Sequence, residues 1–223
     1  MTDDKTVLDH TAVHAAGIDD WRVFLRAIHT RFRTGDFVTG LRLATAIGEA
    51  AEEMNHHPDL DLRYPHLDVK LTSHDVRGIT DRDLRLARRI SELAAAEGIE
   101  ADPSDLSVVE LALDTADHDA IKPFWRAILG FTDTDAPDEV VDADGRLPSL
   151  WFQATEPHEV PRQRFHLDIH VAPEQARSRI DAALAAGGTL VSDAEAPSFW
   201  VLADADGNKA CICTCEGRDS SGG

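Results

Sequence analysis

The sequence predicts an α+β protein of two domains, the first a small antiparallel sheet packed by helices and the second a pair of βαβββ modules. Three observations support this. In the first half, apolar residues recur at helical spacing in two segments and alternate with polar residues in another. In the second half, a strand, a helix and a glycine follow one another twice. Between the halves, Gly98 and Pro103 interrupt the pattern.

The elements of the first half follow in order. Short strands are expected at 21–25 and 28–33, and the apolar spacing predicts a long helix over 37–54. Leucine and valine alternate with polar residues over 67–71, which is typical of a strand with one solvated face. Thr80 followed by Asp83 resembles a capping box and opens a second helix. Two helices against a small antiparallel sheet make an α+β domain.

The second half contains the same strand–helix unit twice. Strand 108–114 leads into helix 120–129, and strand 165–171 leads into helix 173–186. Further strands are expected at 150–154, 189–192, 199–203 and 210–215. Two such units bury their sheets together in one domain. We therefore divide the chain into a domain at 1–100, a linker at 101–106, a domain at 107–216 and a disordered tail at 217–223.

Composition limits the function classes. The chain of 223 residues carries 22 Lys and Arg against 41 Asp and Glu, a formal net charge of −19. Such a charge disfavours nucleic acid and anionic membranes as partners. No apolar run approaches the length of a membrane span, and the N-terminus does not resemble a signal peptide. The three cysteines cannot all pair internally, so we expect a reduced, cytoplasmic protein.

Three histidines form the most informative pattern in the chain. His56 and His57 precede Pro58, and this proline predicts that the preceding helix ends next to them. His74 closes the strand that carries Leu67 and Leu71, so a helix end and a strand end are expected to meet at the mouth of a cleft. Imidazoles titrate near neutral pH, so three of them together predict transfer of protons in both directions.

Other interpretations of these residues stay open at this point. Adjacent histidines are often exposed polar residues without a role, and three clustered histidines are able to bind zinc. The side chains of the neighbours His56 and His57 diverge, which disfavours binding of one ion by both. Tyr64 alone is typical of a core or cross-strand aromatic residue, and Asp83 alone is typical of a helix-capping acid.

The spacing resembles the signature of the pterin-4a-carbinolamine dehydratases over roughly residues 18–98. The matching positions, in order, are Glu52, His56-His57-Pro58, Tyr64, His74 and Asp83. Their surroundings also match at Trp21, at Phe32-x-x-x-Asp36-Phe37 and at Ser73-His74-Asp75-x-x-Gly78-Ile79-Thr80. The resemblance implies a hydro-lyase that dehydrates a 4a-hydroxytetrahydropterin to quinonoid dihydropterin in pterin cofactor recycling.

The same resemblance implies a role for each residue. His56 and His74 would be the acid catalysts, His57 would chiefly position the substrate, and Glu52 would act as a base or hold an imidazole. The remaining residues expected to bind substrate are Pro58, Tyr64, Asp83 and Trp21. Asp83 would also orient one of the histidines. The elimination changes no oxidation state, so no metal or redox cofactor is expected.

The second half resembles the glyoxalase-like, vicinal-oxygen-chelate superfamily. The matching segments are Glu110–Asp117, Phe124–Phe131, His166–Val171 and Asp204–Asn208. Metal enzymes of this superfamily take one ligand from each of four strands, and the matching positions are Glu110, Gln153, His166 and Cys211. Cys211 stands where a glutamate is expected. We therefore expect no catalytic metal here, and a concave sheet lined by His166, Trp151 and Trp200 that suits a flat organic ligand.

Several residues of this half keep two interpretations. Cys211, Cys213 and Cys215 alternate, which is typical of small side chains on one strand face, with a soft-metal site as the alternative. His170 either lines a pocket or is a core histidine with its hydrogen bonds satisfied. The Asp204–Asn208 segment predicts a turn before the last strand.

Two other functions compete with the dehydratase. The main activity could belong to the second domain as a metal-dependent lyase or dioxygenase, or the protein could bind a small molecule in the manner of glyoxalase and bleomycin-resistance proteins. The expected partners are a pterin substrate, a further copy of the chain in a homo-oligomer, and a functional link to an aromatic amino-acid hydroxylase.

Overall fold

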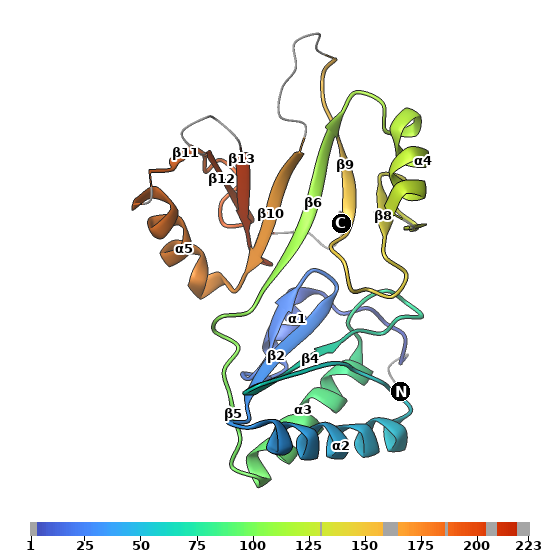
Figure 1. Ribbon diagram of the computed structural model, residues 1–223, viewed down its shortest axis with the longest axis vertical. Coiled ribbons are helices and arrows are strands. Elements are labelled where there is room, and N and C mark those ends of the chain that lie inside the picture. The colour runs from blue at the N-terminus through green and yellow to red at the C-terminus, as the bar shows by residue number, and fades with distance from the viewer. Residues whose placement is uncertain (1–3, 130, 158–164, 186, 204–208, 218–223) are drawn as a thin grey trace. The chain divides into compact units, whose positions relative to one another are not determined.

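The computed structural model describes residues 4–129, 131–157, 165–185, 187–203 and 209–217 (Figure 1). The chain divides into two compact units, Met1–Leu106 and Ser107–Gly223, and each combines helices with a sheet. The predicted α+β class is confirmed. The predicted turn at Asp204–Asn208 and all but the first residue of the predicted tail lie outside the described residues.

The first unit is built on an antiparallel sheet with strand order β1, β2, β4, β3. The strands are β1 (Arg22–Phe24), β2 (Ala27–Arg33), β3 (Asp59–Arg63) and β4 (His66–Leu71), and a short β5 (Glu100–Ala101) pairs with β2. Strands β3 and β4 form a hairpin whose register runs from Asp59 opposite Lys70 to Arg63 opposite His66. Strand β3 was not predicted, and it ends the strand order.

Two long helices, α2 (Phe37–Met54) and α3 (Asp81–Ala96), pack on one face of this sheet, and a short α1 (His10–Ala15) precedes them in the chain (Figure 1). The core between helices and sheet includes Ile28, Phe32, Leu43, Ile47, Leu67, Leu71, Leu86 and Ile90. Asp36 caps α2 by accepting a hydrogen bond from the amide of Thr39 at 2.8 Å. Helix α2 has the bounds that the sequence predicted, 37–54.

The second unit holds an eight-stranded sheet with strand order β11, β12, β13, β10, β6, β9, β8, β7. Its elements are β6 (Ser107–Thr115), α4 (His118–Leu129), β7 (Thr132–Asp133), β8 (Glu139–Val141), β9 (Leu150–Ala154), β10 (Phe165–Val171), α5 (Pro173–Ala185), β11 (Thr189–Ser192), β12 (Phe199–Ala203) and β13 (Lys209–Cys213). Each half of this order is one βαβββ module, as predicted, and the antiparallel pair of β6 and β10 joins the modules.

The two faces of the eight-stranded sheet differ in chemistry. Apolar side chains of β6, β9, β10 and β13 pack in two clusters together with residues of α4 and α5. Alternate residues of the same strands face the other way. The register places Asp168 opposite both Glu110 of β6 and Cys211 of β13, so these side chains share the face that the two helices leave uncovered.

Candidate active site

A fully buried carboxylate forms the centre of the candidate site in the first unit. Asp83 lies in the first turn of α3, and its Oδ1 is 2.7 Å from Nε2 of His56. Its Oδ2 accepts hydrogen bonds from the Ser73 hydroxyl and from the backbone amide of Thr80, both at 2.7 Å. Thr80 and Asp83 complete the predicted capping box. The Asp83 carboxylate therefore connects the segment after α2, the turn that begins at Ser73 and the start of α3.

The local sequence explains why His56 points into the protein. Helix α2 ends at Met54, and Asn55 adopts a left-handed conformation with φ of 48°. Asparagine tolerates this conformation better than most residues because its side chain is short and polar. The chain then reverses, and the amide of His56 bonds to the carbonyl of Ala51 at 3.1 Å. The side chain of His56 is thereby directed to Asp83 and is only 8% exposed.

The hydrogen bonds of Asp83 set its protonation state and orient His56. Burial raises the pKa of Asp83, but hydrogen bonds from His56, from the Thr80 amide and from Ser73 outweigh this and hold the pKa below its ordinary value. An ionised carboxylate only accepts hydrogen bonds, so Nε2 of His56 must carry the proton between them. Nδ1 is then the nitrogen of His56 that is able to exchange a proton with a ligand.

His57 faces away from this network. Its Nε2 lies 3.0 Å from Oε1 of Glu52, and both side chains are exposed. Of the two predicted roles of Glu52, base or holder of an imidazole, this contact is the geometry that the second requires. Pro58 follows at half-buried depth. The predicted divergence of the two adjacent imidazoles is observed.

His74 occupies the turn between Ser73 and Gly78 and is exposed. The turn is anchored on both sides, because the Ser73 amide bonds to the Gly78 carbonyl at 2.9 Å and Asp75 accepts a hydrogen bond from Arg82 at 2.6 Å. Strand β4 ends at Leu71, so His74 lies beyond the strand and not at its last position. Since Ser73 and His56 bind the same carboxylate, the segments that carry His74 and His56 meet there.

The structure places three of the residues that we expected to bind substrate, Trp21, Tyr64 and Asp83, in different settings. Trp21 is buried in the core, and its indole Nε1 donates to the Ser91 hydroxyl at 3.2 Å, which satisfies its polar atom inside the fold. Tyr64 is 73% exposed at the tip of the β3–β4 hairpin. Tyr64 comes five residues after Asp59, the residue that follows Pro58, which is roughly 16 Å along the strand at about 3.3 Å per residue. Asp83, expected to touch substrate, is instead enclosed behind His56.

The uncovered face of the second unit carries a different cluster. Nδ1 of His166 lies 3.5 Å from Oδ1 of Asp114, and Nε2 lies 3.5 Å from Oδ1 of Asp168. Burial raises the pKa of the Cys211 thiol well above its ordinary value, and the negative charge of the neighbouring Asp168 raises it further. The Trp151 ring meets His166 edge-on at 6.1 Å, as expected for a residue lining this face.

The expectation that Trp200 lines this face is wrong. Trp200 packs in the apolar cluster with α5 and lies opposite Ile212, so it belongs to the helix-covered face. His170 is buried on the uncovered face, and its Nε2 lies 3.8 Å from Oε2 of Glu110. Gln153 is exposed. Cys211, Cys213 and Cys215 form no disulfide.

Comparison with known proteins matches both units. A family model described as pterin 4 alpha carbinolamine dehydratase matches residues 6–93, and one described as glyoxalase-like domain matches residues 110–213. A protein of Koribacter versatilis named "Putative pterin-4-alpha-carbinolamine dehydratase" is 33% identical over 90 residues, which are 40% of this chain and 96% of that protein. The chain belongs to the pterin-4a-carbinolamine dehydratase family.

Members of this hydro-lyase family match the first unit, hereafter the dehydratase unit, and the second is a glyoxalase-like unit. A Herpetosiphon aurantiacus protein of the same name is 38% identical over 76 residues, covering 34% of this chain and 79% of that protein. A solved structure, the transcriptional coactivator/pterin dehydratase from Brucella melitensis, is 28% identical, with a TM-score of 0.39, and covers 40% of this chain and 99% of that chain.

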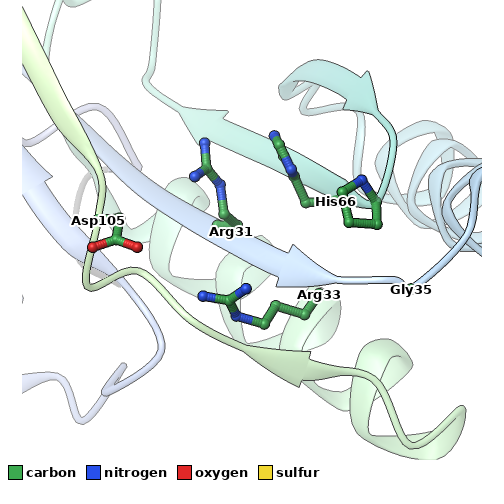
Figure 2. A pocket seen from close by; sticks show the side chains of 6 residues that line it. Arg31, Arg33, Gly35, His66 and Asp105 are labelled. Carbon is green, nitrogen blue, oxygen red and sulfur yellow. The ribbon is translucent and has the colours of Figure 1, made fainter.

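A cavity of about 300 Å³ in the dehydratase unit lies apart from the histidines, and its lining residues are Arg31, Arg33, Gly35, Pro65, His66 and Asp105 (Figure 2). Arg31 donates to both carboxylate oxygens of Asp68 at 2.6 Å, and Arg33 pairs with Asp102. Both guanidinium groups are therefore already paired with acids. The cavity borders the Tyr64–Pro65 hairpin tip and does not contain the candidate catalytic residues.

Ser73 and Thr80 both bind the Asp83 carboxylate, and sequence reasoning gave neither of them a role in the site. The capping box is a local signal that identifies Thr80 as a partner of Asp83. Nothing local marks Ser73 as a ligand of Asp83, because that contact depends on how the turn packs against α3. Both hydroxyls also contact each other at 2.8 Å.

Proposed function

We propose that the dehydratase unit removes water from a 4a-hydroxytetrahydropterin and releases quinonoid dihydropterin. The observation that carries this proposal is the 2.7 Å contact of His56 with a buried, ionised Asp83. It fixes the orientation of one imidazole and leaves Nδ1 for proton exchange. The family membership supplies the substrate class.

The reaction requires one proton delivered and one removed. An imidazolium donates a proton to the hydroxyl on C4a of the pterin, the C4a–O bond breaks, and water leaves. A neutral imidazole takes the proton from N5, and the N5 electron pair forms the N5=C4a double bond. We assign these two steps to His56 and His74, because His56 and Ser73, the neighbour of His74, bind the same carboxylate, so the two segments that carry the histidines meet there.

The exposed pair of His57 and Glu52 has a supporting role in this proposal. Their 3.0 Å contact holds the His57 ring at the surface next to Pro58, where it would orient the pterin and not exchange protons with it. Asp83, Ser73 and Thr80 act on the substrate only through His56 and are positioning residues.

The test is turnover of a 4a-hydroxytetrahydropterin generated by a hydroxylase in a coupled assay. His56→Ala and His74→Ala are each expected to lower kcat by about 10²–10⁴-fold, as for loss of a general acid or base. His57→Ala should raise KM more than it lowers kcat. His14→Ala, an exposed histidine on α1, is the matched control. Turnover of the double variant His56→Ala/His74→Ala close to that of the unchanged protein would refute the assignment.

We further propose that the protein works in pterin recycling beside an aromatic amino-acid hydroxylase in the cytoplasm. The reaction product supports this, because reduction of quinonoid dihydropterin regenerates the cofactor that such hydroxylases consume. Three cysteines that form no disulfide are typical of a reducing compartment.

A homo-oligomer formed through the dehydratase unit also belongs to this proposal. Strand β3 stands at the end of the strand order, and four of its five residues are exposed. Next to it, α2 exposes Phe37, Val38 and Leu41 near its start. Exposed strand edges and apolar side chains favour pairing with another chain. We expect a second copy of this chain to cover them.

A further inference from the structure

The glyoxalase-like unit buries polar atoms that lack hydrogen-bond partners. Asp168 is only 7% exposed, and its Oδ1 has no such partner among the described residues. The same is true of the buried Oδ1 of Asp114. Native proteins rarely leave a buried carboxylate oxygen without a hydrogen bond, so the Oδ1 of Asp168 points to a ligand. Both atoms lie next to His166.

Three ligand atoms of different chemistry converge at this place. A ring nitrogen of His166, a carboxylate oxygen of Asp168 and the sulfur of Cys211 all lie within 4.8 Å of one another. The distance from His166 Nε2 to Asp168 Oδ1 is 3.5 Å, which exceeds an ordinary hydrogen bond. This distance is close to the separation of about 3.3 Å between two ligand atoms of a tetrahedral ion whose bonds are about 2.0–2.1 Å long.

We propose that His166, Asp168 and Cys211 bind a divalent transition-metal ion of the zinc class. Imidazole nitrogen, carboxylate oxygen and thiolate sulfur are all zinc ligands, and the thiol releases its proton to solvent on binding. The negative charge of Asp114, whose Oδ1 lies 3.5 Å from His166 Nδ1, favours a proton on that nitrogen and so leaves Nε2 for the ion. Three protein ligands leave one tetrahedral position for water or for an oxygen of a small molecule.

This ligand set differs from the one that the superfamily resemblance implies. Glu110 accepts a hydrogen bond from the Ser149 hydroxyl at 2.7 Å and does not belong to the converging group. Gln153 is exposed and also lies outside it. Two of the three ligands therefore come from one strand, β10, in place of one from each of four strands.

The difference bears on our expectation that this unit holds no catalytic metal. That expectation counted Gln153 as a weak fourth ligand and treated Cys211 as a packing residue. It did not consider Asp168, which the register places directly opposite Cys211. With Asp168, the site holds a carboxylate beside the thiol, and zinc accepts that combination.

The test is metal binding by the full-length protein after chelator treatment. We expect one equivalent of Zn²⁺ per chain, and Co²⁺ in its place should give the sulfur-to-cobalt charge-transfer band of a thiolate ligand. Cys211→Ser should abolish the band and, like Asp168→Asn, weaken zinc binding by more than about 100-fold. Asp114→Asn should weaken it by about 10–100-fold, as found for residues that orient a metal-binding histidine.

Two controls separate this ligand set from its neighbours. Glu110→Gln changes the carboxylate opposite Asp168 on β6, and Cys213→Ser changes a buried cysteine two residues along β13. Both variants should bind zinc as the unchanged protein does. The proposal is overturned if the unchanged protein takes up no zinc at micromolar concentration, if the cobalt band is absent, or if Glu110→Gln weakens binding as much as Asp168→Asn. Should Cys211→Ser fail to fold, the cobalt spectrum and Asp168→Asn still decide.

Discussion

Oδ1 of Asp83 lies 2.7 Å from Nε2 of His56, although 27 residues separate them in the chain. The contact exists because Asn55 reverses the chain after α2 and because Asp83 sits in the first turn of α3. The other oxygen of the carboxylate is bound by Ser73 and Thr80. The carboxylate therefore connects three segments of the chain, those that carry His56, Ser73 and Thr80.

Replacing Asp83 with asparagine should lower kcat by about 10²–10⁴-fold while leaving KM within a few-fold. The amide can donate to Nε2 of His56, which favours the tautomer with its proton on Nδ1 and removes the negative charge beside the imidazole. The measurement is the pH profile of kcat in the coupled assay. A profile and rate like those of the unchanged protein would show that Asp83 has only a capping role.

Removing either hydroxyl that binds Asp83 should destabilise the start of α3. Thr80→Ala removes the N-cap and is expected to cost about 0.5–2 kcal/mol. Ser73→Ala removes a buried partner of the carboxylate and is expected to cost about 1–3 kcal/mol. Thermal unfolding of the full chain measures both. Thr45→Ala, whose hydroxyl bonds only to the Leu41 carbonyl of its own helix, serves as the control and should stay within about 0.5 kcal/mol.

Acid should destabilise the dehydratase unit through Asp75 as well as Asp83. A hydrogen bond from Arg82, and then one from Lys5, lower the pKa of Asp75 from 3.8 to about 2. Since the folded pKa lies below the unfolded value, the unfolded chain binds more protons in this window. The contribution is complete above the unfolded pKa and is lost as the pH falls from about 4 toward about 2.

Hydrogen exchange reports this loss of stability in the dehydratase unit. Peptides from 73–96 are followed between pH 5 and pH 2.5, and their rates are corrected for the intrinsic exchange rate. Asp75→Asn and Asp83→Asn should each make protection less dependent on pH. The exposed Asp19 provides the control variant Asp19→Asn. Equal pH dependence in all four proteins would contradict the prediction.

Disruption of the β3 edge should dissociate the expected homo-oligomer. Leu60 is exposed on β3, and Leu60→Lys places a charge where a second strand would pair. Light scattering should show a lower mass for this variant than for the unchanged protein at equal concentration. Leu147→Lys changes another exposed leucine, in the other unit, and should keep the oligomer. A 24.4 kDa particle for the unchanged protein would refute the assembly.

Local signals predicted much of the fold. The apolar spacing of α2, the capping box of α3 and the alternation in β4 are each stabilised by residues within a few positions of one another, so sequence alone identifies them. Helix α1 has only six residues and one cap, at Asp9, which gives too short a pattern to recognise. Strand β3 is exposed along almost its whole length, so burial imposes little pattern on it.

The site was predicted less completely because its geometry is non-local. The spacing of His56, His57 and His74 identified the histidines, but the direction of His56 depends on the left-handed Asn55. Trp21 matched the family pattern yet lies in the core, where Ser91, 70 residues away, satisfies its indole. Asp168 was not predicted as a metal ligand, because only strand pairing brings it opposite Cys211.

The capping box of α3 makes helix formation and assembly of the site a single event. The carboxylate that starts the helix is also the one that holds His56, so fraying of this first turn releases the imidazole while the sheet stays intact. Activity would then follow the fraction of molecules in which this one turn is closed. Warming should inactivate the enzyme before any global unfolding signal changes, and a ligand that contacts His56 should protect the amides of the first turn of α3 from exchange.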